Sequence, residues 1–191
     1  MDHFKRSRLK KGTGCRIARS VCFLESDCHG AGSLVSIGNG VVLREGSIIY
    51  GGVTIGNNVT VDHYCVIREG TAIGDGTRIM NYTDIGRDVR IGRDCRIAGF
   101  LANRVVIGCG TSCFGSILHV YGSHGGGRVE EAPVIGDGVV VARGAVLAGG
   151  IRIADGARIR AGEVISPAMA DSDPRVSIAD GSPGEAAQNS R

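Results

Sequence analysis

The sequence contains no tryptophan, only four tyrosines, four phenylalanines and four prolines among its 191 residues. Its 32 glycines are more than twice the usual share, which is typical of a fold with many turns. No apolar run is long enough to cross a bilayer or to form the core of a secretory leader, so we expect neither. The net charge of +3 provides no general field for binding nucleic acid.

The seven cysteines are odd in number and include no CxxC pair. A disulfide framework or a zinc ribbon would need paired or closely spaced cysteines. We therefore expect buried, reduced thiols in a cytoplasmic protein, without a bound metal.

What the sequence has instead is an apolar residue at every sixth position from residue 37 to residue 97. A helix would repeat every 3.6 residues and an exposed strand every two, so neither explains a period of six. A short strand followed by a turn does explain it, and stacked coils of such units bury a continuous apolar column. The positions are Ile37, Leu43, Ile49, Ile55, Val61, Ile67, Ile73, Ile79, Ile85, Ile91 and Ile97.

Three units close a triangle, so a coil takes eighteen residues and the chain is expected to form six or seven coils. Ile107 follows Ile97 by ten residues, which we interpret as a four-residue insertion in one corner. We expect a basic N-terminal arm at residues 1–16, a β-helix domain at 17–165 and a partly disordered tail at 166–191. The arm and the tail are the segments available to cap the two ends of the stack.

The units IGNNVT, IGDGTR, IGRDVR, IGRDCR and IGDGVV resemble the hexapeptide repeat of left-handed β-helix acyltransferases over about residues 37–165. The resemblance implies an all-β fold, a single-stranded left-handed parallel β-helix. It also implies a homotrimer with active sites between subunits, a small-molecule acceptor, and acetyl-CoA as the acyl donor. Neither a nucleic acid nor a membrane is expected as a partner.

The repeat is interrupted at about residues 119–134 by a Gly-rich, charged stretch that we expect to protrude as a loop. Galactoside and maltose acetyltransferases carry a similar interruption, with the catalytic His five residues after the third unit position. Here His119 takes that position and His124 follows it by five, before Pro133 restores the repeat. The resemblance thus assigns His124 as the general base, a task that neutral imidazole can perform near pH 7.

The same resemblance implies backbone donors for the acyl-CoA. An oxyanion donor maps onto Ala142 and Arg143, and the donors to the pantetheine arm map onto Arg160, Ala161 and Gly162. The family's basic residue after the last coil is replaced here by Ser166, and its closing lysine is missing. The residues that bind the CoA phosphates are therefore unassigned.

One corner of the predicted prism departs from turn chemistry. Tyr64, Tyr82 and Phe100 lie eighteen residues apart at positions where a positive φ is expected, and β-carbons are penalised there. The three rings are predicted to stack as a ladder, with His63 over Asn81 beside it. With His119, these residues are candidates for contacts in the trimer interface or with a flat acceptor, such as a nucleotide base or a sugar ring.

The acceptor is open. The run from residue 56 to residue 76 is similar to nucleotide-sugar N-acetyltransferases and indicates an amino sugar. One alternative is a zinc enzyme like the γ-class carbonic anhydrases, with His63, His119 and His124 as ligands. Another is a structural β-helix subunit without chemistry, although the long interruption of the repeat argues against it.

Overall fold

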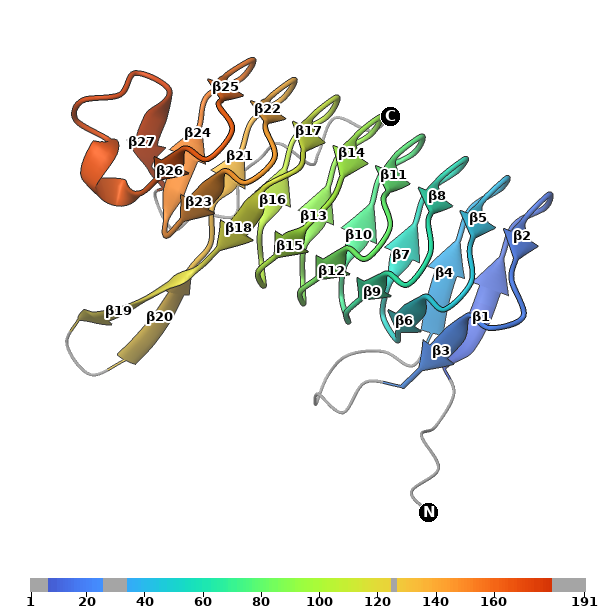
Figure 1. The fold of residues 1–191 in the computed structure, drawn as a ribbon. Helices are drawn as coiled ribbons and strands as arrows, with labels where there is room; N and C mark the ends of the chain where they lie inside the picture. The colour runs from blue at the N-terminus through green and yellow to red at the C-terminus, as the bar shows by residue number, and fades with distance from the viewer. Residues whose placement is uncertain (1–6, 26–33, 125–126, 180–191) are drawn as a thin grey trace.

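The computed structural model describes residues 7–25, 34–124 and 127–179, and for residues 120–130 it describes the backbone alone. The described chain is a triangular prism of parallel strands, as predicted, and it forms a left-handed β-helix (Figure 1). The only helix among the described residues is the 3₁₀ turn η1 (Pro167–Met169). No helix in these ranges has the length and apolarity needed to cross a membrane.

Three parallel sheets form the faces of the prism. The first sheet contains β1 (Arg8–Lys11), β4 (Leu34–Ile37), β7 (Thr54–Ile55), β10 (Ala72–Ile73), β13 (Arg90–Ile91), β16 (Val106–Ile107), β21 (Val134–Ile135) and β24 (Ile151–Ile153). The second contains β2 (Arg16–Ile17), β5 (Val42–Leu43), β8 (Thr60–Val61), β11 (Arg78–Ile79), β14 (Arg96–Ile97), β17 (Ser112–Cys113), β22 (Val140–Val141) and β25 (Arg158–Ile159). The third contains β3 (Cys22–Leu24), β6 (Ile48–Tyr50), β9 (Val66–Ile67), β12 (Asp84–Ile85), β15 (Phe100–Leu101), β18 (Ser116–Leu118), β23 (Val146–Ala148) and β26 (Val164–Ile165).

These strands make eight coils, and the chain turns at three corners in each coil. The first corner joins the first sheet to the second, the second corner joins the second sheet to the third, and the third corner leads to the next coil. The predicted apolar column is confirmed, because all eleven residues at the sixfold positions are at most 5% exposed. Burying each such side chain contributes about 1.5–3 kcal/mol, which makes this column the main source of stability.

Small polar side chains fill the inner side of several corners. The buried hydroxyl of Thr77 donates to the carbonyl oxygen of Gly92 at 2.8 Å and accepts the amide of Cys95 at 3.0 Å. Such hydroxyls join neighbouring coils where the backbone ladder is interrupted by a turn. Cys65, Cys95 and Cys113 are also buried, and burial raises the pKa of each thiol to about 11. The six described cysteines are free.

The second corner is two residues shorter in coils five and six than in the other coils. Leu101 lies opposite Ile85, sixteen residues before it, and Ile117 lies opposite Leu101 at the same interval. The interpretation of a four-residue insertion after Ile97 is therefore wrong. A four-residue unit places Leu101 inward, and a normal six-residue unit then leads to Ile107. Likewise Ile117, not His119, takes the inward position.

In both coils, the two residues by which the corner is shorter are those of the usual turn. The chain passes this corner through Ala98 and Gly99 in coil five, and through Phe114 and Gly115 in coil six, without the usual two-residue turn. We call these four residues the shortened corner. A Cβ at Gly99 would lie 2.5 Å from the carbonyl oxygen of Gly115, so the two passages are closely stacked.

The first coil begins within the segment expected to be a basic arm. Strand β1 pairs with β4, and Lys11 lies opposite Ile37. The residues of β1 are exposed, since β1 is the edge strand of its sheet and no further coil covers it among residues 7–25, 34–124 and 127–179. A charged residue can therefore occupy a position that would be buried in any later coil.

The other end of the stack is covered by the segment after Ile165. Strand β27 (Val176–Ile178) runs antiparallel to β24 and buries Val176. Arg175 holds this segment in place, with Nη2 2.5 Å from both Glu163 Oε1 and Asp173 Oδ2, and with Nη1 donating to the Arg158 carbonyl oxygen at 2.8 Å. The tail residues 180–191 lie outside the described chain.

The protrusion predicted at about residues 119–134 is present, but it is a β-hairpin rather than a loop. Strand β19 (Val120–His124) pairs antiparallel with β20 (Gly127–Glu131). The hairpin leaves the third corner between coils six and seven and extends away from the prism (Figure 1).

Candidate active site

Most of the predicted site residues lie along the second corner of the prism. This corner carries His63 and Tyr64 in coil three, and Asn81 and Tyr82 in coil four. The shortened corner follows in coils five and six. Coils seven and eight then place Arg143, and Ala161 with Gly162, on the same edge. The aromatic residues and the candidate backbone donors thus lie along the same edge of the molecule.

The two tyrosines form the stack that the spacing predicts. Their φ angles are +57° for Tyr64 and +60° for Tyr82, in the left-handed region that is unusual for bulky residues. Their ring centroids are 5.6 Å apart and their planes differ by 4°. The Tyr64 ring lies directly over Gly46, where a side chain would collide with it. Tyr82 ends the stack and is 74% exposed.

Phe100 does not form the third ring of this ladder. The two-residue deletion moves it out of the turn and onto strand β15, opposite Asp84, while Gly99 takes the positive φ of 104°. Phe100 is 42% exposed on the outer face of the third sheet. It therefore lies beside the shortened corner, on the side of the third sheet.

His63 is held by oxygen atoms on both of its ring nitrogens. Nε2 lies 3.0 Å from Glu45 Oε2, and Nδ1 lies 3.2 Å from Asn81 Oδ1. The same Asn81 oxygen accepts the backbone amide of His63 at 3.0 Å, which fixes it as an acceptor. These two contacts hold the His63 ring against the second corner.

The backbone donors on coils seven and eight are partly engaged. The Ala142 amide donates to the Ile159 carbonyl oxygen at 3.0 Å, which corrects its expected role as an oxyanion donor. The Arg160 amide donates to Glu163 Oε2 at 2.8 Å. Arg143 on coil seven, and Ala161 and Gly162 on coil eight, remain at exposed turns of the second corner.

The two histidines of the interruption lie at the third corner. His119 is half-buried at the base of the hairpin, and His124 is the last residue of β19, opposite Gly127. The side chain of His124 lies outside the part of the structure that is described. The base of the hairpin is anchored to the prism by a bond from the Gly149 amide to the Leu118 carbonyl oxygen at 3.0 Å. A five-residue strand spans about 17 Å, and the end of β19 stands away from the prism (Figure 1).

Among the described residues no group of three or more His, Cys, Asp or Glu side chains is arranged to hold a metal ion. Within one chain, His63 and His119 lie at different corners and three coils apart. Any metal site made from them would have to combine residues of different subunits.

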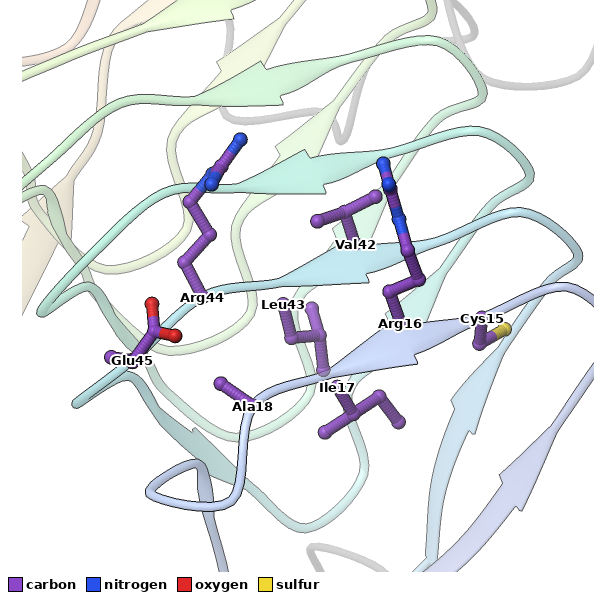
Figure 2. Close-up of a pocket in the computed structure, with 8 residues that line it drawn as sticks. All are labelled: Cys15, Arg16, Ile17, Ala18, Val42, Leu43, Arg44 and Glu45. Carbon is purple, nitrogen blue, oxygen red and sulfur yellow. The ribbon is translucent and has the colours of Figure 1, made fainter.

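A hollow that the sequence did not reveal lies at the N-terminal end of the second sheet (Figure 2). Strand β2 is the edge of that sheet, so no further coil of the described chain covers this surface. Arg44, one of its lining residues, pairs with Asp62 at 3.1 Å. The hollow is thus a consequence of the open end of the stack. Its lining residues are Cys15, Arg16, Ile17, Ala18, Val42, Leu43, Arg44 and Glu45.

Comparison with known proteins agrees with this geometry. The family model described as bacterial transferase hexapeptide (six repeats) matches residues 34–69 and 70–100. The match covers about a third of the chain, within coils two to five of the prism. No curated protein matches the chain.

Several solved structures are similar to the chain. A hexapeptide transferase family protein from Anaplasma phagocytophilum is 17% identical, with a TM-score of 0.35, and the match covers 81% of this chain and 72% of that one. The acetyltransferase domain of PglB from Neisseria gonorrhoeae FA1090, in complex with acetyl coenzyme A, is 18% identical with a TM-score of 0.31, over 75% of this chain and 53% of that one. The polySia specific acetyltransferase NeuO is 16% identical with a TM-score of 0.29, over 84% and 76%.

Proposed function

We propose that the protein is a CoA-dependent acyltransferase that transfers an acyl group, with acetyl as the first candidate, to an amine or hydroxyl of a small acceptor. The observation that carries the proposal is the hairpin β19–β20. It interrupts an otherwise continuous hexapeptide stack, it ends its first strand on His124, and Pro133 then restores the repeat. A purely structural coil stack would have no need of this excursion.

His124 acts as the general base in this proposal. It accepts the proton of the acceptor amine or hydroxyl as that atom attacks the thioester carbon. The new C–N or C–O bond forms, the C–S bond breaks, and CoA leaves as the thiol after it takes up the proton. The negative charge that develops on the carbonyl oxygen needs a preorganised donor, and the Arg143 amide on coil seven is the candidate.

The reach of the hairpin supports a site that is shared between copies of the chain. His124 stands at the outer end of a strand about 17 Å long, whereas Arg143 lies on another corner of the same prism. A neighbouring prism in a homotrimer would bring its own second corner to this hairpin. In the proposed assembly, one subunit therefore supplies the base and its neighbour supplies the backbone donors.

The proposal is tested by release of free thiol from acetyl-CoA in the presence of candidate acceptors. The panel contains amino sugars, nucleotide-linked amino sugars, simple sugars and small amines, because an amino sugar is the acceptor that the sequence indicates. Turnover with at least one acceptor is expected. Failure of the whole panel, with acetyl-CoA and then with longer acyl donors, would remove the proposal.

The role of His124 is tested separately with three variants. His124→Ala should lose at least 100-fold in turnover, within the range that general base catalysis contributes. Ser123→Ala, on the same strand, is the matched control and should retain activity. His119→Ala shows whether a loss of turnover is specific to His124 or common to both histidines of the interruption. Light scattering must show the same assembly for all three, and unchanged turnover of His124→Ala would exclude it as the base.

A further inference from the structure

We propose that the exposed ring of Tyr82, together with Arg96 and Arg143, forms a binding site for a nucleotide at the shortened corner. The ring would stack on the base, and the two guanidinium groups would bind its phosphates. The inference rests on the proposed function, since a nucleotide group is present both in CoA and in nucleotide-linked sugars. It adds a site and a ligand chemistry to that proposal.

The first observation is the open end of the tyrosine stack. Gly46, Tyr64 and Tyr82 follow one another on coils two, three and four, and each ring covers the position before it. The next coil would normally provide a turn residue over Tyr82. Because the second corner of coil five lacks two residues, no turn residue is there, and Tyr82 is 74% exposed. The stack therefore ends in an aromatic face that can hold one more flat ring.

The second observation is that the backbone at this corner is stacked too closely to accept a side chain at either glycine. Besides the close approach of Gly99 to Gly115, a Cβ at Gly115 would lie 2.5 Å from the carbonyl oxygen of Ala145. At the two glycines, successive passages of the chain are thus tightly stacked backbone, and Ala98 and Phe114 are the residues of the shortened corner that carry side chains. The deletion occurs in two neighbouring coils, so the gap in the turn ladder is two coils high.

The third observation is the charge around the gap. Asp62 pairs with Arg44 and with Arg78, at 3.1 Å and 2.8 Å, and so compensates the arginines of the lower coils. Arg96 stands in register with Arg78, one coil higher, and is exposed. Within the described part of the chain it has no carboxylate partner.

Arg96 precedes Ala98 and Gly99 in the same coil, so its backbone lies within about 10 Å of the gap. Arg143 is exposed at the second corner of coil seven, on the far side of the gap from Tyr82. An aromatic face with a cation beside it and another beyond it is the combination that recognises a base together with its phosphates.

A neutral sugar ring would use the aromatic face but would leave the two guanidinium groups without anions. A nucleoside diphosphate uses all three groups, which is why the observations favour it. The shared chemistry is that of adenosine 3′,5′-bisphosphate, the nucleotide half of CoA, and of UDP, the nucleotide half of many activated sugars.

Isothermal titration calorimetry of the full chain with each of these two nucleotides is the test. Uridine and inorganic phosphate, titrated separately, show what the base and the phosphate contribute alone. At least one nucleotide should bind more tightly than either part. Binding of the adenosine bisphosphate identifies the donor as the source of the nucleotide, and binding of UDP identifies the acceptor.

Tyr82→Asn removes the ring but keeps a residue type that accepts this backbone conformation, as Asn58 does at a φ of 55°. It should weaken nucleotide binding roughly 5- to 150-fold, the range that stacking of one base on an aromatic side chain provides. Tyr82→Phe keeps the ring and should retain the affinity. Arg96→Ala should weaken binding and reduce its salt dependence, whereas Arg90→Ala, exposed in the same coil on the first sheet, should not.

Two results would overturn the inference. One is that neither nucleotide binds the wild-type protein. The other is that the dissociation constant for the nucleotide is unchanged in Tyr82→Asn. If the oligomeric mass of that variant then differs from that of the wild type, the corner serves contacts between copies of the chain. Nucleotide binding is measured without turnover, so its result is independent of whether the protein transfers an acyl group. A Tyr82-dependent nucleotide affinity in a protein that transfers no acyl group would refute only the latter.

Discussion

Gly115 is the position where a single added methyl group should disturb the shortened corner most. A Cβ there would lie 2.5 Å from the Ala145 carbonyl oxygen and 2.9 Å from Val141 Cγ1. The Ala145 oxygen also accepts the Ser116 amide at 2.9 Å, so it cannot withdraw without lengthening a bond between coils. Gly115→Ala should therefore force coils six and seven apart locally.

The expected cost combines two effects. Forcing an extra methyl group into close-packed structure costs about 1–3 kcal/mol, and weakening one buried hydrogen bond costs about 0.5–1.5 kcal/mol. The free energy of unfolding should thus fall by about 3 kcal/mol. In a chain of this size, 1 kcal/mol corresponds to about 2–4 °C in melting temperature, so the melting temperature should fall by roughly 10 °C.

Gly110→Ala is the matched control. Gly110 has a φ of +66°, and nothing lies within 4 Å of the position of its Cβ. Its replacement therefore costs only the left-handed conformation, about 1–2 kcal/mol. The loss of chain flexibility in the unfolded state is common to both variants and cancels in the comparison.

Differential scanning calorimetry of both variants, with the calorimetric and van't Hoff enthalpies compared, provides the measurement. The free energy of unfolding should fall about 1–2 kcal/mol further for Gly115→Ala than for Gly110→Ala. Equal drops would show that neighbouring coils relax easily, and the close stacking of the shortened corner would then lose its support.

Three further predictions concern the stack and its cap. Thr77→Val should lower the free energy of unfolding in urea by about 2–4 kcal/mol, because it leaves a buried carbonyl and a buried amide unpaired, whereas Thr54→Val on the exposed face should have little effect. The three buried thiols should resist iodoacetamide at pH 8 in the folded protein, since their pKa is raised to about 11, while exposed Cys22 reacts; equal rates would contradict the burial. Arg175 lowers the pKa of Asp173 to about 2, so the stability that this pair adds should be present above about pH 4 and lost as the pH falls toward 2. Hydrogen exchange of strand β27 measures this loss, which Arg175→Met should abolish.

The sixfold period predicted the core because every sixth residue of the repeat is apolar and points into the prism. All eleven positions from residue 37 to residue 97 are buried. Turn chemistry was equally informative at Tyr64 and Tyr82, since two bulky residues at positions that favour Gly or Asn had to adopt a positive φ for the repeat to continue.

The shortened corner was missed for a simple reason. A spacing of ten between Ile97 and Ile107 is compatible with a six-residue unit plus four inserted residues, or with a four-residue unit followed by a normal one. Leu101 was visible as an apolar residue, but only strand pairing shows that it points inward. The same ambiguity moved Phe100 into a turn and placed His119 in the core, and it contributed to the expectation of six or seven coils instead of eight.

The first strand of the stack and the two strands of the hairpin escaped prediction because they do not bury a periodic face. Lys11 lies opposite Ile37, but it is exposed at the edge of the sheet, so no apolar pattern marks the first coil. In the hairpin, two strands pair only with each other, and their register depends on the turn between them. The assignment of His124 as the base remains a prediction for this reason, since it depends on an assembly that a single chain does not specify.

The stacked tyrosines also determine how the protein interacts with light. The chain has no tryptophan, so its near-ultraviolet absorption comes chiefly from four tyrosines. Two of these rings lie parallel, with centroids 5.6 Å apart, which is close enough for their electronic transitions to couple. The near-ultraviolet circular dichroism spectrum should therefore be dominated by one corner of the prism. That spectrum provides a label-free signal for any event at Tyr82, from ligand binding to assembly.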